Sequence, residues 1–345
     1  MSVIPPLLVS IGEPAGIGPD ILLNVWDKVR AKDLEQVAPF AVVADPDHLS
    51  KRAGQLGVDL KIGVCETPDK ILSIFSKGDC LPVIPLKNKF LGQAAQPEDR
   101  DAAGIIESIE TAVRWIKDGM ARAIVTLPIN KKSLYDAGFD YPGHTEFLGA
   151  LCEKWEERAT PLRPVMMLAG PELRAVPVTI HIPLKDVAVQ LSEHDIVETV
   201  RITAVDLRDR MGVKNPRIAI SGINPHAGEG GALGLEDDAV IVPAIEKLKD
   251  EGINCWGPLP ADTMFHAAAR ATYDAAICMY HDQALIPAKA LAFDESVNVT
   301  LGLPIVRTSP DHGTAFDIAG TGKANPASFI AALRMADQMS LNQIS

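Results

Sequence analysis

Short apolar runs recur along the chain, and turns or stretches with helical spacing separate them. Several of these runs are apolar at nearly every position, which is typical of strands that are covered on both faces in a parallel sheet. The pattern predicts strands over 6–12, 40–45, 80–86, 123–128, 165–170, 174–182, 217–224, 275–281 and 297–303.

Helical patterns lie between many of these strands. In the segment 102–119, Ile105 and Ile109 fall on one helical face, and the segments 192–212 and 235–252 have the same periodicity. The regular alternation of strands and helices predicts an α/β protein with a largely parallel sheet.

Composition narrows the class of protein. With 345 residues, 47% of them hydrophobic and 23% charged, the chain can form two ordinary globular domains or one large one. The formal net charge of −12 argues against a nucleic-acid or anionic-membrane partner, so the positive charge that binds an anionic substrate must be local. The first residues contain neither a basic region nor a long apolar run, which predicts a cytoplasmic protein.

Cysteine usage points to a reducing compartment. The five cysteines are odd in number and form no C-x-x-C pair, so we expect reduced, structural thiols and neither a disulfide framework nor a zinc–thiolate site. They are Cys65, Cys80, Cys152, Cys255 and Cys278.

Two glycine-rich segments follow apolar runs, and neither matches the dinucleotide fingerprint G-x-G-x-x-G. In the segment 221–234, a fingerprint beginning at Gly228 would need glycine where Leu233 stands. In the segment 12–21, Ile21 occupies the third glycine position. This second segment is either a tight strand-to-helix turn or a loop that contacts a ligand.

Three histidines stand at or just past the ends of predicted strands: His181, His226 and His281. Ligands of open α/β sheets bind beyond the carboxyl ends of the strands. Neutral imidazole is a common metal ligand, and three such ligands leave coordination positions open for a substrate. The pattern indicates a three-histidine metal site, with ordinary loop histidines as the alternative.

Three other histidines have simpler interpretations. His48 and His194 lie in sequences typical of helix starts and are expected to be surface or capping residues. His266 is expected to pack near the core from a helix.

Longer motifs add a family resemblance. The motifs are GEPAGIGPD, PGHTEFL, TIHIPLKDV, INPHAGEGG, GPLPADTMF, MYHDQALIPAK and VNVTLGLPIVRTSPDHGTAFDIAGTGKA. Together they resemble the 4-hydroxythreonine-4-phosphate dehydrogenase family of vitamin B6 biosynthesis, in the expected order and over nearly the whole chain. The sequence departs from the family at Glu13, where many members have aspartate, and at Leu127, where a polar residue is usual.

The resemblance implies the two-domain α/β fold of isocitrate and isopropylmalate dehydrogenases, with mostly parallel central sheets, and not a Rossmann fold. It implies a large cofactor-side domain of residues 1–133 and 290–345. Residues 134–289 would form a second domain that carries the metal ligands and the dimer interface. The protein would be a homodimer whose metal site is shared between subunits.

The resemblance also assigns residues. It implies metal ligation by His181, His226 and His281. It implies substrate contacts from His144, Thr145, Lys289, Asn298 and Arg307. The segment DHGTAFDIAGTGKANP is similar to an adenosine-binding loop, which implies cofactor contacts from His312, Gly313 and Asp317. An acid or base is also required, and its candidates are Asp262 and Asp282, which could instead be helix-cap or loop-bracing residues.

The implied reaction is an oxidative decarboxylation. NAD, with NADP as the alternative, would oxidise 4-phosphooxy-L-threonine at C3, and loss of CO₂ would then give 3-amino-2-oxopropyl phosphate. One divalent cation (zinc, magnesium or cobalt) would polarise the C3 oxygen. The alternatives are the same chemistry on D-threonate or D-erythronate 4-phosphate or on a cyclic diol carboxylate, and a non-catalytic relative that binds a metal or ligand.

Overall fold

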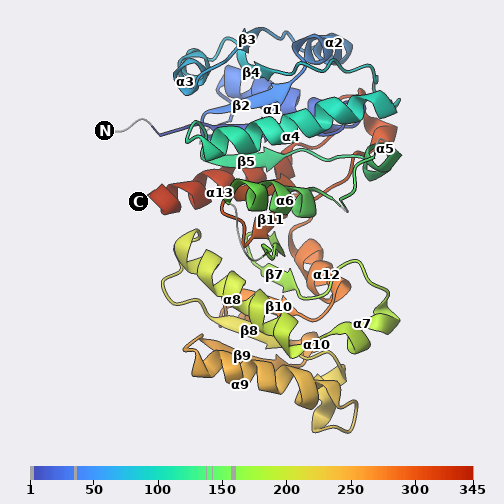
Figure 1. Cartoon of the computed structure of the whole chain (residues 1–345), viewed down its shortest axis with the longest axis vertical. Coiled ribbons are helices and arrows are strands. Elements are labelled where there is room, and N and C mark those ends of the chain that lie inside the picture. Colours follow the sequence, from blue (N-terminus) through green and yellow to red (C-terminus); the bar gives the residue numbers. More distant parts are fainter. Residues whose placement is uncertain (1–3, 35–36, 137, 142, 157–160, 345) are drawn as a thin grey trace. The chain divides into compact units, whose positions relative to one another are not determined.

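The protein divides into two compact units, each of which is an α/β structure (Figure 1). The computed structural model describes residues 4–34, 37–136, 138–141, 143–156 and 161–344. Unit 1 consists of Met1–Pro164 and Leu303–Ser340, and unit 2 consists of Val165–Gly302 and Leu341–Ser345.

The sheet of unit 1 is entirely parallel, in the order β3-β4-β2-β1-β5-β12. A Rossmann sheet places its second strand beside its third, whereas here β4 separates β2 from β3, so the non-Rossmann expectation is confirmed. The strands are β1 (Leu7–Ser10), β2 (Phe40–Ala44), β3 (Ile62–Val64), β4 (Leu81–Pro85), β5 (Ala123–Thr126) and β12 (Val306–Pro310).

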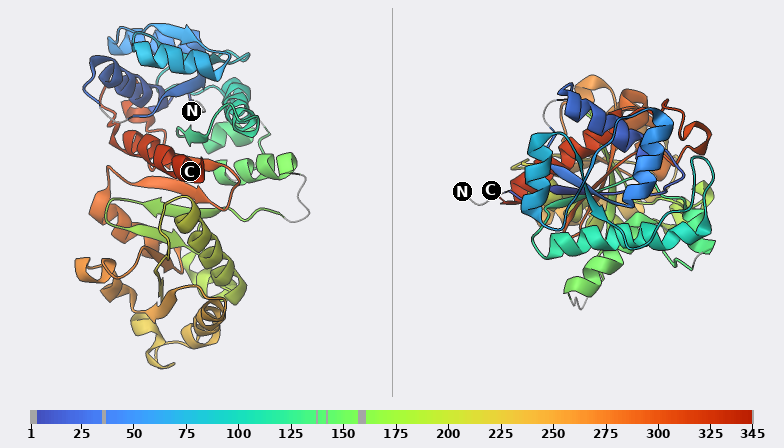
Figure 2. Two further views of the ribbon diagram at one scale, coloured as in Figure 1. Left: turned by 90° about the vertical axis from the view of Figure 1, so that its left-hand side faces the viewer. Right: turned by 90° about the horizontal axis from the view of Figure 1, so that it is seen from above.

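Helices surround these strands in the end-on view of Figure 2. They are α1 (Gly18–Ala31), α2 (Pro46–Leu56), α3 (Pro68–Lys77), α4 (Ala102–Lys117), α5 (Lys131–Asp136), α6 (His144–Glu156) and α13 (Ala327–Ile344), with the short 3-10 helices η1 (Asp99–Asp101) and η4 (Phe316–Ile318). Two of them have clear start and stop signals. Asp45 and Thr67 cap the amino ends of α2 and α3, and Gly57 and Gly78, both with φ of 70°, end them.

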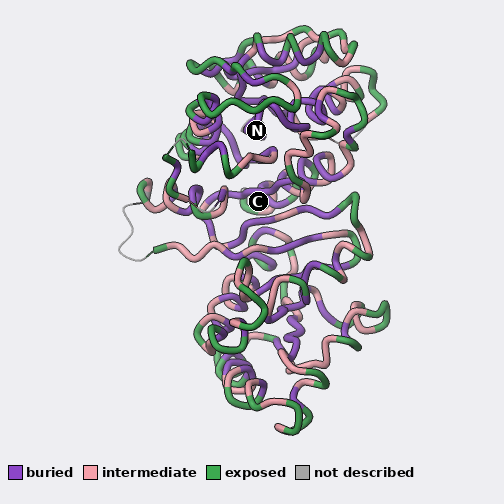
Figure 3. The backbone as a smooth tube through the Cα atoms, turned by 90° about the vertical axis from the view of Figure 1, so that its right-hand side faces the viewer, coloured by how far each residue is buried: buried purple, intermediate pink, exposed green. Residues whose placement is uncertain are grey.

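Strands β1, β2 and β5 are buried throughout, and β4 is buried at all but its last residue, as their continuous hydrophobic runs predict (Figure 3). The short strand β3 is partly exposed. One buried polar group connects the sheet to α4. The Ser108 hydroxyl accepts a hydrogen bond from the Ile11 amide (3.1 Å) and donates one to the Val43 carbonyl (2.7 Å). Because both backbone groups lie in the core, this hydroxyl satisfies polar atoms that water cannot reach.

The sheet of unit 2 is mixed, in the order β11-β6-β7-β10-β8-β9. Its first two pairs are antiparallel, and the pairs β7–β10, β10–β8 and β8–β9 are parallel. The strands are β6 (Val165–Ala169), β7 (Arg174–Pro177), β8 (Ile218–Ser221), β9 (Cys255–Leu259), β10 (Ala275–Cys278) and β11 (Val297–Leu301).

The helices of unit 2 are short apart from three. The longer ones are α8 (Glu193–Asp209), α9 (Val242–Asp250) and α12 (His281–Ala292), and the shorter ones are α7 (Leu184–Gln190), α10 (Ala261–Met264), α11 (Ala267–Arg270), the 3-10 turn η2 (Pro225–Glu229) and the π-turn η3 (Asp237–Ile241). Across the described residues of both units, none of the helices is long and apolar enough to span a membrane.

Each of the nine predicted strands corresponds to a strand of the structure, but three strands of the described residues were not predicted. One is β12, whose sequence VRTSP is polar at three positions although all five residues are buried. Tertiary partners explain its burial, since Thr308 donates to the Ala332 carbonyl (2.9 Å) and Arg307 donates to Thr126. Another is β9, which contains Pro258 and lies at the sheet edge, where proline is tolerated.

The units divide at different residues from the expected domains. Residues 134–164 group with unit 1, and α6 in this segment packs against α4. Residues 290–302 group with unit 2, because β11 pairs with β6 along its whole length.

Two of the three simple histidine interpretations are wrong. His48 is buried, and its Nε2 atom bonds to the Gly92 carbonyl (3.2 Å), so it is no surface residue and Asp45 is the cap. Burial lowers the pKa of His48 to about 4. His266 is exposed and caps α11, while His194 is exposed as expected.

We predict that Ser108→Ala destabilises the protein, because it leaves the Ile11 amide and the Val43 carbonyl unsatisfied in the core. The expected loss is about 1–3 kcal/mol, measured by urea unfolding. Ser50→Ala is the control, since Ser50 also donates to a backbone carbonyl but is exposed, and it should change stability by no more than about 0.5 kcal/mol. Equal effects of the two substitutions would contradict this account.

Candidate functional site

The three candidate metal ligands follow three neighbouring strands of unit 2. His181 comes after β7, His281 begins α12 directly after β10, and His226 lies in η2 after β8. The strands are parallel and adjacent in the order β7-β10-β8, so their carboxyl ends share one edge of the sheet. This is the edge at which ligands of open α/β sheets bind.

Hydrogen bonds beyond the strand ends hold the His181 and His281 segments together. The Thr179 amide (3.2 Å) and hydroxyl (2.7 Å) both donate to the Met279 carbonyl. The chain after β7 therefore stays beside the chain after β10, although the strand itself stops at Pro177, earlier than its sequence predicts. The imidazole ring centroids of His181 and His281 lie 6.0 Å apart.

Gln283 connects the His281 segment to the segment that follows β8. Its buried side-chain oxygen accepts from the Ser221 hydroxyl (2.8 Å) and the Met279 amide (2.7 Å), and its nitrogen donates to the Gly222 carbonyl (2.8 Å). Sequence reasoning missed this residue. The available signal was a polar side chain two positions after His281 at the start of a largely apolar helix.

The loop that carries His226 has an unusual backbone. His226 and Ala227 both have φ of 52°, a left-handed conformation that costs about 1–3 kcal/mol for a residue other than glycine. The buried carboxylate of Asp237 holds the loop, because it accepts from the amides of Ile223 (2.9 Å) and Asn224 (3.2 Å). Asp237 was also missed, since it lies outside the histidine motif.

The two candidate acids lie close to the histidines. Asp282 is exposed, and its Oδ1 atom lies 2.7 Å from the Nδ1 atom of His281. A carboxylate in this position favours the proton on Nδ1 and leaves the lone pair on Nε2, the arrangement typical of a metal-binding histidine. Asp262 is exposed on α10.

A cavity of about 790 Å³ brings four of the predicted residues together: His181, His281, Asp262 and Asp282. Apolar side chains of α7 and α12 form much of the remaining wall. His226 is exposed and does not line the cavity. Within the described ranges, no group of three His, Cys, Asp or Glu side chains is arranged to hold a metal ion, so the three-histidine site stays a prediction.

Unit 1 contains a second cluster, which is cationic. The buried Arg307 guanidinium donates from Nε (3.1 Å) and Nη2 (2.8 Å) to the Thr126 hydroxyl. Burial lowers the pKa of Arg307 to about 10, which keeps it charged at neutral pH. His144 and Thr145 open α6, and the amino end of a helix favours an anion.

His144 in this cluster is held neutral. Burial, followed by repulsion from Arg307 and Lys131, lowers the pKa of His144 well below its usual value. Its Nε2 atom is buried and has no hydrogen-bond partner in the described part of the chain. A buried polar atom of this kind is suited to a ligand that supplies the missing bond.

The two remaining substrate candidates belong to unit 2. Lys289 lies on α12, with its ammonium 5.9 Å from the ring centroid of Phe293. Asn298 lies on β11 and is partly exposed. The five candidate substrate residues therefore come from both units, three from unit 1 and two from unit 2.

The candidate cofactor residues follow β12 in unit 1. The Nδ1 atom of His312 lies 3.1 Å from the carbonyl oxygen of Gly313, which is exposed. Asp317 is exposed in η4, immediately after Ala315 and Phe316. An exposed acid on a short turn is available to ribose hydroxyls, as the resemblance implies.

Comparisons with known proteins complete this picture. Residues 35–336 match the family model described as pyridoxal phosphate biosynthetic protein PdxA. The chain is 50% identical over 342 residues to 4-hydroxythreonine-4-phosphate dehydrogenase of Bradyrhizobium diazoefficiens, covering 97% of this chain and 96% of the relative. The chain belongs to the PdxA family.

Solved structures agree with this assignment. A crystal structure of 4-hydroxythreonine-4-phosphate dehydrogenase from Klebsiella pneumoniae superposes with a TM-score of 0.83 and 32% identity, over 97% of this chain and 99% of that one. A terephthalate 1,2-cis-dihydrodiol dehydrogenase from Burkholderia xenovorans shares the fold, with a TM-score of 0.64 and 24% identity over 96% and 97% of the two chains. As a PdxA-family member, the protein is a dehydrogenase of pyridoxal phosphate biosynthesis.

Glu13, one of the two residues that depart from the family pattern, gives a pH prediction. It is buried, and burial raises its pKa from 4.5 to about 7. In the unfolded chain this carboxyl group ionises at a lower pH than in the folded protein. The folded state therefore binds more protons between pH 4.5 and about 7, and the stability of the protein falls as the pH rises through this window. Glu13→Gln removes this titration. As the pH rises from 4.5 to about 7, the free energy of unfolding of the variant should therefore increase by up to about 3 kcal/mol relative to that of the wild type.

The measurement is urea unfolding of both proteins across the pH window. Parallel pH dependences of wild type and Glu13→Gln would contradict the prediction.

Proposed function

We propose that the protein uses NAD⁺ to oxidise 4-phosphooxy-L-threonine at C3 and then releases CO₂, giving 3-amino-2-oxopropyl phosphate in a reaction that requires a divalent cation. The observation that carries the proposal is the placement of His181, His226 and His281 after three adjacent parallel strands, in a chain whose relatives are named 4-hydroxythreonine-4-phosphate dehydrogenase.

The donor set fits a divalent cation. Three neutral imidazoles suit zinc or cobalt and leave positions open for substrate oxygens, and magnesium is the weaker alternative. When bound, such an ion lowers the pKa of a coordinated hydroxyl and stabilises negative charge on its oxygen. Gln283 would hold the His281 segment beside the segment that follows β8, and Asp237 would brace the loop that carries His226.

We assign different roles to the two acids. The contact between Asp282 and the Nδ1 atom of His281 favours an orienting role, in which the carboxylate fixes the proton position on the ring. Asp262 then becomes our candidate for accepting the proton of the C3 hydroxyl, since it lines the same cavity and is exposed to a substrate.

The phosphate and carboxylate of the substrate need fixed positive charge in a protein of net charge −12. Arg307 is buried, cationic and able to bind an oxyanion in bidentate fashion. His144 and Thr145 add donors at the start of α6, and we assign Lys289 and Asn298 as further contacts.

NAD⁺ is assigned to the segment after β12, with contacts from His312, Gly313 and Asp317; NADP⁺ is the alternative. We place the protein in the cytoplasm, where this cofactor is available and where cysteine thiols remain reduced.

We also propose a homodimer with the metal site shared between subunits. Unit 2 exposes several large apolar side chains on α7, on α12 and directly after α12, and two of them, Leu184 and Ile286, line the cavity that contains His181 and His281. Apolar side chains gathered beside a binding cavity favour an interface between two copies. They are Leu184, Val189, Ile286 and Phe293.

We predict that purified protein with NAD⁺, a divalent cation and 4-phosphooxy-L-threonine forms NADH and CO₂ in equal amounts. Chelation should abolish the reaction, and zinc, cobalt or magnesium should restore it. His226→Ala should lower kcat/KM by about 100-fold or more, because it removes one ligand of the cation.

His194→Ala is the matched control, since His194 is an exposed histidine of the same unit outside the site, and its activity should equal that of the wild type. NADH from D-threonate or D-erythronate 4-phosphate, or from a cyclic diol carboxylate, but not from 4-phosphooxy-L-threonine would overturn the substrate. Binding of NAD⁺ without turnover of any of them would indicate a non-catalytic relative.

We predict that Lys289→Ala raises KM for the phosphorylated substrate about tenfold with little change in kcat, because the lost charge contributes to binding before and during the reaction. Initial rates at varied substrate concentrations provide the measurement. An unchanged KM would show that the substrate anion binds elsewhere.

A further inference from the structure

A buried ion pair in unit 1 lies beside the candidate cofactor segment. We propose that its members, Arg52 and Asp20, are positioning residues for the dinucleotide, because they fix the glycine turn at Gly320, which follows Asp317 in the candidate cofactor segment. The inference rests on the proposed function, in which His312, Gly313 and Asp317 contact NAD⁺, and it adds two residues that make no cofactor contact themselves.

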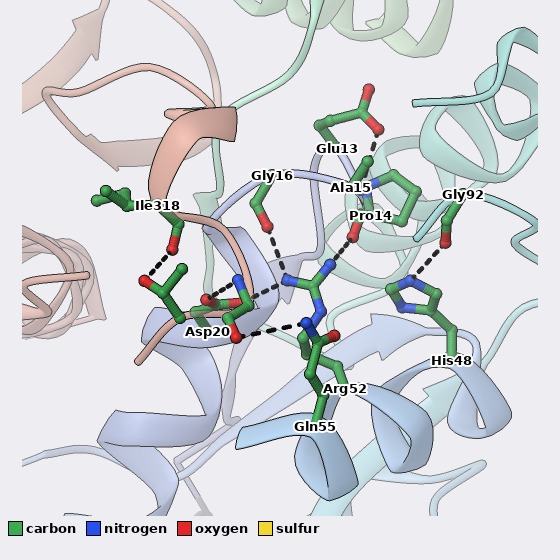
Figure 4. Close-up of polar contacts among 12 residues, drawn as sticks. Glu13, Pro14, Ala15, Gly16, Asp20, His48, Arg52, Gln55, Gly92 and Ile318 are labelled. Carbon is green, nitrogen blue, oxygen red and sulfur yellow. Dashed lines mark hydrogen bonds and ion pairs between the residues drawn. The ribbon is translucent and has the colours of Figure 1, made fainter. Parts of the chain in front are cut away.

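Arg52, on α2, is the centre of the network (Figure 4). Its guanidinium donates to the carbonyls of Pro14 (2.8 Å) and Gly16 (3.0 Å) and to a carboxylate oxygen of Asp20. Both charged side chains are almost completely buried, with 2% of each exposed. The loop after β1 and the first turn of α1 are therefore held by one planar cation.

Asp20 connects the Arg52 network to the cofactor segment. While one carboxylate oxygen accepts from Arg52, the other accepts from the Gly320 amide (2.6 Å), 300 positions away in the sequence. The charge on Asp20 strengthens this bond, because a hydrogen bond to an ionised acceptor in a buried site is stronger than a neutral one. Arg52 in turn compensates the carboxylate, which makes its burial tolerable.

The turn at Gly320 accepts only glycine. Its φ is +73°, and a Cβ atom there would lie 2.3 Å from the Gln55 side-chain nitrogen and 2.7 Å from the Ala94 Cβ atom. Gln55 also donates to the Gly320 carbonyl (3.4 Å). The backbone of the turn is therefore enclosed by α2 and by the loop around Ala94.

The backbone that precedes Asp317 is held by the same region of the chain. The Ile17 amide donates to the Thr314 carbonyl (2.9 Å), so the start of α1 fixes Thr314 while Asp20 fixes Gly320. Between these two anchors Asp317 remains exposed. A loop with fixed ends and an exposed centre is preorganised, and it loses less conformational freedom when a ligand binds.

The geometry needs arginine rather than any cation. The three acceptors of Arg52 lie in different directions, and a planar guanidinium can reach all of them, whereas a lysine ammonium can keep the ion pair but not the full set. Arg52→Lys therefore retains the buried charge balance and loosens the loop. Asp20→Asn retains an acceptor of the same shape but removes the charge.

The same unit provides a matched control, Arg122. It is also buried, and it donates to the Pro5 carbonyl (2.7 Å), to the Ser340 hydroxyl (2.6 Å) and to the Asp337 carboxylate. Arg122 precedes β5, so it lies at the amino end of the parallel sheet, whereas the Arg52 network follows the carboxyl end of β1. Arg122→Lys loosens a comparable network away from the cofactor segment.

The test measures KM for NAD⁺, KM for 4-phosphooxy-L-threonine and kcat for the wild type and the variants Arg52→Lys, Asp20→Asn and Arg122→Lys. Calorimetric titration with NAD⁺ alone gives the dissociation constant. All measurements are made at a temperature at which circular dichroism shows each protein folded. For Arg52→Lys and Asp20→Asn we expect KM and Kd for NAD⁺ to rise about tenfold, while kcat and the other KM stay within about twofold.

Arg122→Lys should lower the melting temperature without changing either KM. The inference is overturned if the Arg52 and Asp20 variants bind NAD⁺ as the wild type does, or if all three variants change every kinetic constant alike, since the pair would then be only structural. If the wild type neither binds NAD⁺ nor turns over, the proposed function fails and this inference fails with it.

Discussion

The parallel pairing of β7, β10 and β8 is the constraint on which the site of unit 2 depends. Parallel neighbours end at one edge of a sheet, so residues separated by dozens of positions in the sequence emerge side by side. Backbone and side-chain hydrogen bonds then extend this alignment beyond the strands, through Thr179 to Met279 and through Gln283 to Gly222. Each histidine thus stands on a segment whose starting point is fixed by the sheet.

In unit 1 two buried arginines take part in such connections. The Arg52 network lies beyond the carboxyl end of β1, and the Arg307 guanidinium on β12 reaches Thr126, the last residue of β5. Burying a charge costs free energy unless the charge is compensated, and the surroundings of the two arginines differ in this respect. Arg52 is compensated by Asp20, whereas Arg307 donates to the Thr126 hydroxyl and is attracted by Glu146, and burial lowers its pKa.

Sequence patterns predicted the strands that are apolar and the loops that follow them. They failed where polar residues are buried, as in β12, because its burial depends on partners such as Thr126 and Ala332 that are remote in the sequence. They also missed Gln283 and Asp237, whose importance lies in the backbone groups that they satisfy. The prediction of His48 as a surface or capping residue was wrong for the same reason, since nothing in the neighbouring sequence indicates its hydrogen bond to the Gly92 carbonyl.

By itself the sequence determined the α/β class, the family and the identity of the candidate ligands, because periodicity and motifs are local properties of the chain. Tertiary structure decided which of these residues meet: His181 and His281 share a cavity with Asp262 and Asp282, while His226 lies outside it on a left-handed turn. It also decided that Asp20 bonds to Gly320. Such contacts depend on the register of strands and the packing of helices, which no short stretch of sequence encodes.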